Sequence, residues 1–339
     1  MICCPNCFND TFLTTIIHQN SDTNGTCDFC NTQNIITIDT EFINDYFQPL
    51  LDLYEEVQEG GKSISKLLKD DWELFSSLDE DVTINLLNSI FKVEFNQQFI
   101  AKNNDDKAKI LNWQDFKTEL KHNNRYFPKK APSYEHLKGL LQYILLPDEN
   151  IPEYLFRARI NIDTDIINID KMGKPPEKLS TAGRANPTGI PYLYTASNTQ
   201  TAIAEIRPHK GDSITVATFK VKETLSLADL RNPRQSISPF VLDENGLNQI
   251  FIDLDYLCHL GDELSKPILP REAHLEYLSS QYLCELIKHC EYDGVIYKSS
   301  VGNGDNYAIF SDYKLEAVKT EVHMIEKIKI SSTKIEGKE

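Results

Sequence analysis

Two pairs of cysteines near the N-terminus constrain the fold of this chain more tightly than any other feature of its sequence. Cys4 and Cys7 form one C-x2-C pair, Cys27 and Cys30 form a second, and nineteen residues separate the pairs. Each pair can present two sulfur ligands from one tight turn, and four thiolates complete a tetrahedral zinc shell. Gly25 lies just before the second pair and permits a tight turn there. We therefore predict a structural zinc ion held by these four cysteines.

Two alternatives to this zinc shell need weighing. Cys3 adjoins Cys4 and could replace it as a ligand. Disulfides are less favoured, because thiols stay reduced in the cytoplasm. A four-cysteine shell leaves no open coordination position for a substrate, so the metal stabilises a segment too small to fold alone. We expect residues 1–39 to form a small zinc ribbon. Its last residues, Asn34–Ile38, alternate in the pattern of a strand.

The next segment, residues 40–147, has the pattern of an all-α helical domain. Apolar residues recur at helical spacing in FINDYFQPLLDLYEEV, with Pro49 expected to kink or break the helix, and further helices are expected at SISKLLKDDWELFSS and DVTINLLNSIF. A polar basic loop follows around Lys121–Lys130. One more helix is expected in SYEHLKGLLQYILL, with Ser133 as its N-terminal cap.

From residue 148 the pattern changes to mixed strands and helices. Strands are expected in YLFRARI, IPYLYTA, SITVATFKV, LSLADL, GVIYKS and NYAIFS, and helices in TQTAIAEI and EYLSSQYLCELIKHC. We therefore predict an α+β domain over residues 148–326, followed by a charged tail at 327–339. A chain of 339 residues is long enough for these parts.

Net charge and hydropathy limit where in the cell this protein is expected and which classes of molecule it is expected to bind. The formal net charge is −16 and the pI is about 5.0, so nucleic acid is an unfavoured partner for the surface as a whole. No apolar run is long enough to cross a bilayer, and the first residues lack the basic-then-apolar pattern of a secretory signal. We expect a cytoplasmic protein that does not bind membranes.

Three stretches of the C-terminal segment carry the residues suited to chemistry on a dinucleotide. They are FRAR at Phe156–Arg159, RANPTGIPYLYTASNTQTAIAE at Arg184–Glu205, and YDGVIYKSS at Tyr292–Ser300. Arginine can clamp a pyrophosphate with two parallel hydrogen bonds. A carboxylate can stabilise the oxocarbenium-like transition state of glycosidic cleavage. An arginine in a Gly/Pro-rich turn and a glutamate on a following helix fit these two needs.

These stretches resemble the RES domain, a family named for an arginine, a glutamate and a serine far apart in sequence. The resemblance covers roughly Pro152–Val318 and implies an ADP-ribosyltransferase-like α+β fold. Many family members are toxins that consume NAD and are neutralised by an antitoxin. The helical segment, with DDWELFS, is similar to the HEPN-like domain that precedes some RES domains, although no arginine–histidine ribonuclease motif is present.

The resemblance implies that the chain cleaves the nicotinamide–ribose bond of NAD, with water or inorganic phosphate as the acceptor. It would then act as a growth-arresting toxin or defence effector. Its candidate partners are an antitoxin or regulatory protein and, in a homo-oligomer, further copies of the same chain. Transfer of ADP-ribose to a protein is the near alternative. A zinc-ribbon module that senses NAD or binds protein or nucleic acid, without catalysis, is the alternative from another class.

The resemblance also implies roles for individual residues. Glu205 corresponds to the catalytic glutamate, Arg157 to the first arginine and Ser299 to the serine of the family name. Arg184 is expected on the pyrophosphate, although the turn reads GRANP where the family usually has GRWNP. Tyr194 is expected against the nicotinamide or ribose. Asn306 is expected at the end of the pocket. Arg159, Tyr192 and Ser300 stay open as alternatives to Arg157, Tyr194 and Ser299.

Overall fold

The structure is a computed structural model that describes residues 1–102, 113–162, 165–269 and 271–329. No helix in these ranges is both long enough and apolar enough to cross a membrane. The predicted tail at 327–339 lies outside the described residues from position 330 onward.

The chain folds into two compact units that do not follow the sequence in a simple order. The first unit contains Met1–Ile144 and Asn232–His259, and the second contains Leu145–Arg231 and the chain from Leu260 onward. The first unit is therefore built from two separate stretches of sequence. Residues 232–259, which fall inside the predicted C-terminal domain, pack with the N-terminal part instead.

The cysteine segment of the first unit consists of short strands around one helix. Antiparallel pairs are formed by β1 (Ile2–Cys3) with β4 (Ile38–Asp39), and by β2 (Asn24–Gly25) with β3 (Ile35–Ile36). The strand expected at Asn34–Ile38 corresponds to β3 and β4. Helix α1 (Thr11–Asn20) was not predicted, and it begins where the Asp10 carboxylate accepts the N–H of Leu13 at 2.8 Å.

Helices form most of the middle segment. They are α2 (Asn44–Leu51), α3 (Ile64–Trp72), α4 (Glu80–Phe91), α6 (Trp113–Thr118), the π-helix η3 (Glu119–Asn123) and α7 (Tyr134–Leu141). Pro49 lies inside α2. Helix α7 begins as predicted, because the Ser133 hydroxyl accepts the N–H of His136 at 3.2 Å.

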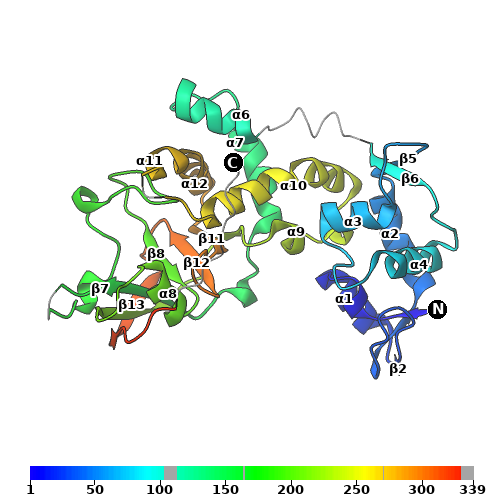
Figure 1. Cartoon of the computed structure of the whole chain (residues 1–339), viewed down its shortest axis with the longest axis horizontal. Coiled ribbons are helices and arrows are strands. Elements are labelled where there is room, and N and C mark those ends of the chain that lie inside the picture. Colours follow the sequence, from blue (N-terminus) through cyan, green and yellow to red (C-terminus); the bar gives the residue numbers. More distant parts are fainter. Residues whose placement is uncertain (103–112, 163–164, 270, 330–339) are drawn as a thin grey trace, which may run out of the picture. The chain divides into compact units, whose positions relative to one another are not determined.

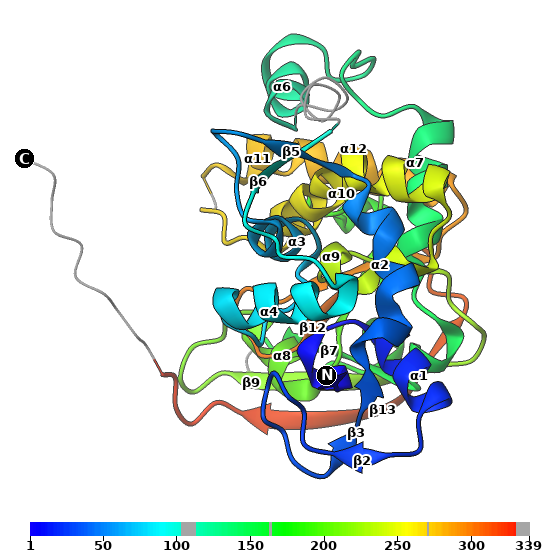
Figure 2. The same cartoon turned by 90° about the vertical axis from the view of Figure 1, so that its right-hand side faces the viewer.

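The middle segment is not all-α, and this part of the prediction was wrong. Strands β5 (Tyr54–Val57) and β6 (Gln98–Ala101) pair antiparallel, as Figure 2 shows. The helical spacing that begins at Phe42 therefore stops at Leu51, and Tyr54 starts a strand. Pairing with a distant segment decides the conformation here, since local propensity is only a weak preference.

Residues 232–259 complete the aromatic core of the first unit. They include α9 (Pro233–Ser236) and most of α10 (Glu244–Ser265). Phe251 stacks on Trp72 with ring centroids 5.9 Å apart, and Phe240 packs on Phe47 at 4.7 Å. Burial of such rings is a large apolar contribution, so this stretch is an integral part of the first unit.

The second unit is an α+β domain built on one seven-stranded sheet, which confirms the predicted fold class. The strand order is β10-β11-β12-β8-β7-β9-β13, in which β10 and β11 are parallel and the other neighbours are antiparallel. The strands are β7 (Tyr154–Ile160), β8 (Leu193–Ala196), β9 (Ser213–Val221), β10 (Leu227–Asp229), β11 (Gly294–Lys298), β12 (Asp305–Ile309) and β13 (Leu315–Met324). The first six were predicted; the edge strand β13, seen beside β9 in Figure 2, was not.

An apolar cluster covers each face of this sheet. Leu155 and Phe219 belong to one cluster, whereas Ala158 and Val216 belong to the other. Successive side chains of a strand point to opposite faces, so the clusters lie on opposite sides. The second cluster also contains Ala202 of helix α8 (Thr199–Glu205). The unit's other helices include α11 (Ala273–Glu276) and α12 (Leu278–His289), and Figure 1 labels all three.

Candidate active site and candidate metal centre

A cavity of about 330 Å³ opens in the second unit where β7, β8, β11 and β12 meet helix α8 (Thr199–Glu205). Most of the predicted site residues line it, although they come from distant parts of the sequence. These are Arg157, Arg184, Tyr194, Glu205 and Asn306. The cavity therefore brings two guanidinium groups and one carboxylate to the same space.

Glu205 is the last residue of α8, and it is partly buried. The helix is fixed at its start by Asn198, whose side chain accepts the N–H of Thr201 at 2.8 Å. Ala202, one turn before Glu205, packs against the sheet. This short helix therefore holds the carboxylate of Glu205 at the cavity wall.

One oxygen of the Glu205 carboxylate carries two hydrogen bonds. Ser299 donates its hydroxyl to Oε1 at 2.6 Å, and Asn306 donates its amide to the same atom at 2.6 Å. Within the described part of the chain, Oε2 has no hydrogen-bond partner. The carboxylate is thus oriented through one oxygen while the other is left for a ligand.

The hydroxyl of Ser299 is fully engaged. It accepts the backbone N–H groups of Gly302 at 2.9 Å and Val301 at 3.2 Å, and it donates to Glu205. A Cβ at Gly304 would come within 2.5 Å of the Asn198 amide, so the loop after β11 can approach α8 only with glycine there. In this structure the Ser299 hydroxyl therefore orients the Glu205 carboxylate.

Arg157, on β7, enters the cavity with few partners of its own. Its Nη1 donates to the carbonyl of Tyr194 at 3.1 Å, while its buried Nε has no hydrogen-bond partner among the residues that the structure describes. Burial, with a smaller contribution from the charge of Arg159, lowers the pKa of Arg157 to about 10, so it stays protonated at neutral pH. A buried cation without a carboxylate is costly unless an anion occupies the site.

Arg159 was the alternative to Arg157, and its surroundings are different. Its guanidinium donates to the carbonyls of Lys171 at 3.0 Å and Gly173 at 3.4 Å. It is not among the residues that line the cavity. The geometry therefore favours Arg157 as the arginine that faces a ligand.

Arg184 lies in the GRANP turn, which helix α12 holds in place. Ser280 donates to the carbonyl of Arg184 at 2.6 Å, and Gln281 donates to that of Gly183 at 2.7 Å. The Arg184 guanidinium lies over the Tyr277 ring, 5.7 Å from its centroid, and donates to the carbonyl of Lys266. The arginine is thus presented at the cavity wall by a fixed turn.

Tyr194 also holds the GRANP turn in place. Its hydroxyl accepts the N–H of Ala185 at 3.0 Å and donates to Oδ1 of Asn186 at 2.8 Å. A Cβ on Gly183 would come within 2.5 Å of that Asn186 oxygen and 2.6 Å of the Tyr194 hydroxyl, so only glycine fits. The hydroxyl of Tyr194 is therefore used within the protein, and its side chain borders the cavity.

The two remaining alternatives do not line the cavity. Tyr192 is buried in the core, where its hydroxyl donates to Glu285 and its ring packs on Phe310 at 4.8 Å. Ser300 is partly buried beside Ser299. Tyr194, which the sequence favoured over Tyr192, lines the cavity. Ser299, which the sequence favoured over Ser300, is bonded to Glu205.

Two further tyrosines of the cavity were missed by sequence analysis. Tyr277 and Tyr297 both line it. Tyr297 is only 3% exposed, yet its hydroxyl has no hydrogen-bond partner in the described ranges. Burial raises the pKa of Tyr297 well above its usual value, so the phenol stays protonated. It lies directly across from Asn306 in the β11–β12 pair, and this strand register was the signal that the sequence alone could not supply.

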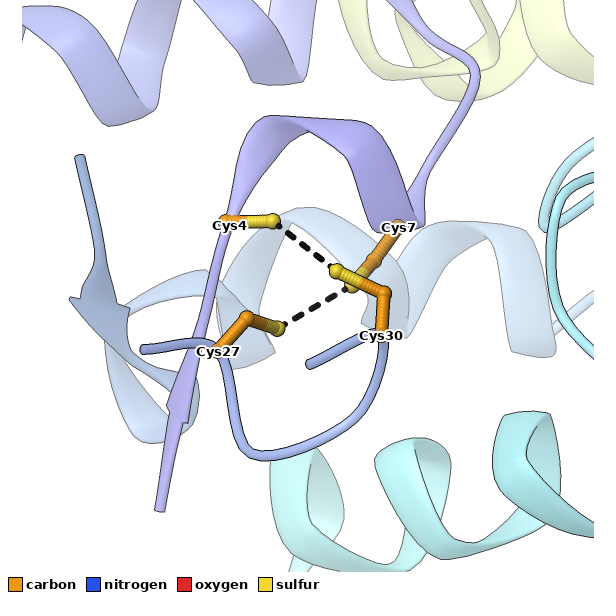
Figure 3. A group of neighbouring side chains, drawn as sticks. All are labelled: Cys4, Cys7, Cys27 and Cys30. Carbon is orange, nitrogen blue, oxygen red and sulfur yellow. Dashed lines mark hydrogen bonds between the residues drawn. The ribbon is translucent and has the colours of Figure 1, made fainter. Parts of the chain in front are cut away.

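The cysteines form a second candidate site, in the first unit. Cys4, Cys7, Cys27 and Cys30 have sulfur atoms that all lie within 4.8 Å of one another. Figure 3 shows the four side chains converging, with 3.4 Å between the sulfurs of Cys4 and Cys30 and 3.5 Å between those of Cys7 and Cys27. Cys3 is outside this group, and its thiol points to the carbonyl of Ile38.

Comparisons with known proteins identify the family of the chain. The RES domain family model matches residues 156–329, slightly more than half of the sequence. This chain therefore belongs to the RES domain family, as the sequence motifs had indicated.

A solved structure of low similarity is among the matches. The crystal structure of the M. tuberculosis MbcT-MbcA toxin-antitoxin complex matches with 14% sequence identity and a TM-score of 0.32. The match covers 55% of this chain and 92% of that chain. This similarity is too low to transfer structural or functional detail. A comparison with curated protein sequences found no significant match.

Proposed function

We propose that this RES protein cleaves the bond between nicotinamide and ribose in NAD, and that it acts as a growth-arresting toxin or defence effector. Family membership supports a RES-type activity. The observation that carries the proposal is the Glu205 carboxylate, oriented by Ser299 and Asn306 at a cavity that Arg157 and Arg184 also line.

The chemistry of this bond fits a site with one carboxylate. Nicotinamide carries a cationic glycosidic nitrogen and leaves without protonation, so no general acid is needed. The transition state gathers positive charge at the ribose, where a fixed carboxylate oxygen lowers its energy. In this proposal, Oε2 of Glu205 faces the ribose, while Oε1 stays bonded to Ser299 and Asn306.

The two arginines suit the anionic part of the same substrate. NAD has a pyrophosphate, and guanidinium groups bind such oxygens with charge-assisted hydrogen bonds. The unsatisfied Nε of Arg157 and its buried charge support an anionic ligand at this wall. Arg184 is held at the cavity by its turn and by Tyr277. We assign the pyrophosphate to both residues.

The aromatic wall suits the departing ring. Tyr277 and Tyr297 offer ring surface, and the protonated hydroxyl of Tyr297 can donate to the carboxamide oxygen of nicotinamide. Tyr297 adjoins Asn306, which itself contacts Glu205. In this proposal nicotinamide lies near the carboxylate, and the leaving group is seated where the bond breaks.

The direct test is to incubate the purified protein with NAD, with and without inorganic phosphate, and to identify the products by mass spectrometry. We expect nicotinamide together with ADP-ribose, or with its 1-phosphate when phosphate is the acceptor. Intact-mass analysis of added proteins tests ADP-ribose transfer in the same reaction. Saturable NAD binding without nicotinamide release would contradict the proposal and favour a sensor.

Replacing Tyr297 with Phe tests the nicotinamide assignment. Loss of one neutral hydrogen bond should raise KM for NAD and the inhibition constant of nicotinamide by about 3- to 10-fold. Inhibition by ADP-ribose should not change. Tyr307→Phe is the matched control, because Tyr307 lies across from Ile296 and so on the other face of the sheet. Equal nicotinamide inhibition in Tyr297→Phe and wild type would exclude the assignment.

We also propose that the four-cysteine group holds a structural zinc ion. A tetrahedral shell with Zn–S bonds of about 2.3 Å separates its sulfurs by about 3.8 Å. The closest sulfur pairs, at 3.4 and 3.5 Å, and the overall limit of 4.8 Å fit that shell. With Cys4, Cys7, Cys27 and Cys30 as ligands, no position is open for substrate.

Removing a zinc ligand should unfold residues 1–39, whereas NAD cleavage should not be abolished by this change alone. We expect wild-type protein to contain about one zinc per chain by elemental analysis, and Cys7→Ser to lose it. Proteolysis should then cut within residues 1–39 of the variant. Cys3→Ala is the control and should keep its metal, because Cys3 lies outside the group. Full zinc content in Cys7→Ser would refute the ligand set.

An enzyme that consumes NAD needs restraint in its own cell. We therefore expect an antitoxin or regulatory protein as a partner of this RES protein. Co-expression of that partner should restore growth in cells that make the wild-type enzyme.

A further inference from the structure

The segment Lys121–Lys130 carries charge of the opposite sign to the protein as a whole. Between Glu119 and Glu135 the sequence has four basic residues, Lys121, Arg125, Lys129 and Lys130, and no acidic residue. The whole chain has a net charge of −16. The expectation that nucleic acid is an unfavoured partner came from that total, and it does not describe this local surface.

Two aromatic side chains stand out from this segment. Tyr126 and Phe127 are each 82% exposed, the largest values among the exposed large hydrophobic residues in the described part of the chain. Aromatic rings are usually buried, because each one removes a large apolar area from water. Two consecutive, solvent-exposed rings therefore each offer a face for stacking with a ligand.

The segment is held in a defined conformation. Its first three residues, Lys121–Asn123, belong to the π-helix η3 (Glu119–Asn123), a rare element that often marks functional positions. The Asn124 side chain donates to the carbonyl of Phe127 at 2.6 Å and accepts its N–H at 3.1 Å. The Glu119 carboxylate accepts the N–H groups of Lys129 at 3.0 Å and Lys130 at 2.8 Å. The aromatic pair is thus displayed by a fixed loop.

The cations around the rings are available to an anion. The side chains of Arg125, Lys129 and Lys130 are exposed. Among the described residues, Arg125 donates only its Nε, to the carbonyl of Leu120. Lys130 lies 3.8 Å from Asp115 in an exposed ion pair, which is worth little in water. Phosphate groups can therefore compete for these side chains.

We propose that the Lys121–Lys130 segment binds single-stranded nucleic acid. Bases stack on Tyr126 and Phe127, and the phosphates contact Arg125, Lys129 and Lys130. Exposed aromatics beside cations are the usual means of binding unpaired strands, since every base offers a face for stacking. A membrane is less suited, because only two consecutive apolar side chains are offered and exposed Asn123 and His122 lie close by.

The test is fluorescence anisotropy with the full chain and labelled oligo(U) and oligo(dT) of about 20 nucleotides. Contacts with three phosphates predict a slope of about −2 in log K against log salt. Tyr126→Ala/Phe127→Ala should lower the affinity at least about 10-fold without changing this slope. Lys129→Gln/Lys130→Gln should reduce the slope by about 1.4. Binding of either oligomer supports the proposal. Binding of oligo(U) alone would show a preference for RNA, and binding of oligo(dT) alone a preference for DNA.

The control is Tyr313→Ala, which removes another exposed aromatic side chain, 62% exposed, from the second unit and should bind like wild type. Circular dichroism and NAD cleavage should be unchanged in all these variants. No binding by wild type at low salt, or equal binding by Tyr126→Ala/Phe127→Ala, overturns the proposal. The proposal is also overturned if Tyr126→Ala/Phe127→Ala keeps its affinity for the oligonucleotides and loses binding to phosphatidylserine vesicles instead. The same holds if this variant loses only self-association, measured by light scattering.

Discussion

Replacing Glu205 with Gln should lower the rate of NAD cleavage by about 100- to 1000-fold, because an amide lacks the negative charge that stabilises the developing cation. The fold should be preserved. The amide oxygen of the new side chain can still accept hydrogen bonds from Ser299 and Asn306, which now meet at one carboxylate oxygen. Nicotinamide release, followed at saturating NAD, measures the effect.

The control for this variant is Glu316→Gln, which changes an exposed carboxylate on β13 that pairs with Lys222 at 4.0 Å. Its rate and thermal stability should equal those of wild type. If Glu205→Gln cleaves NAD at the wild-type rate, the carboxylate has no part in the reaction. If it loses activity together with secondary structure, Asn306→Ala, which keeps the carboxylate and removes one of its donors, becomes the more informative variant.

Replacing Arg157 with Met should reduce kcat/KM for NAD by about 10- to 100-fold, the loss expected for hydrogen bonds to a charged group. Thermal stability should stay equal or rise. Arg157 has an unsatisfied Nε and no salt bridge in the described ranges, so the apo protein gains little from it. Active-site groups often reduce stability in this way. Kinetics and thermal unfolding together test the prediction.

Arg159→Met is the matched control, because Arg159 is two residues away on the same strand. Its guanidinium is satisfied by the carbonyls of Lys171 and Gly173, away from the cavity. This variant should keep its activity and lose stability. The opposite outcome, with activity lost only in Arg159→Met, would reassign the pyrophosphate to Arg159.

The strands of the second unit could be predicted because their alternation is strong. YLFRARI and SITVATFKV form β7 and β9 with the predicted bounds. The edge strand β13 was harder, because its register shifts between Ala317 and Lys319 and most of its side chains are exposed. Its apolar residues therefore show no clear inward face.

Helix α10 escaped prediction for a different reason. Its sequence, ENGLNQIFIDLDYLCHLGDELS, contains Gly246 and Gly261 and several Asp and Asn residues, all of which disfavour a helix. Tertiary packing outweighs that preference. A Cβ at Gly261 would lie 2.3 Å from the carbonyl oxygen of Leu230, so glycine is required there for close packing.

The candidate site was predictable in its charged groups and not in its geometry. Glu205 and Arg157 were found through the motifs that carry them. The contact of Ser299 with Glu205 spans 94 residues of sequence and depends on the strand order. Tyr297 could not be recognised, because a tyrosine in a buried strand has the same sequence pattern whether it packs in a core or faces a ligand.

The interleaving of the two units sets an order for folding during synthesis. The first unit lacks Phe240 and Phe251 until residue 259 has left the ribosome, so its aromatic core cannot close early. Ser299 and Asn306, which orient Glu205, are made later still. A nascent chain therefore carries the arginines and the glutamate for some time without the strands β11 and β12 that assemble them. If the protein cleaves NAD as we propose, a ribosome-bound chain should therefore stay inactive toward NAD until β11 and β12 have been translated.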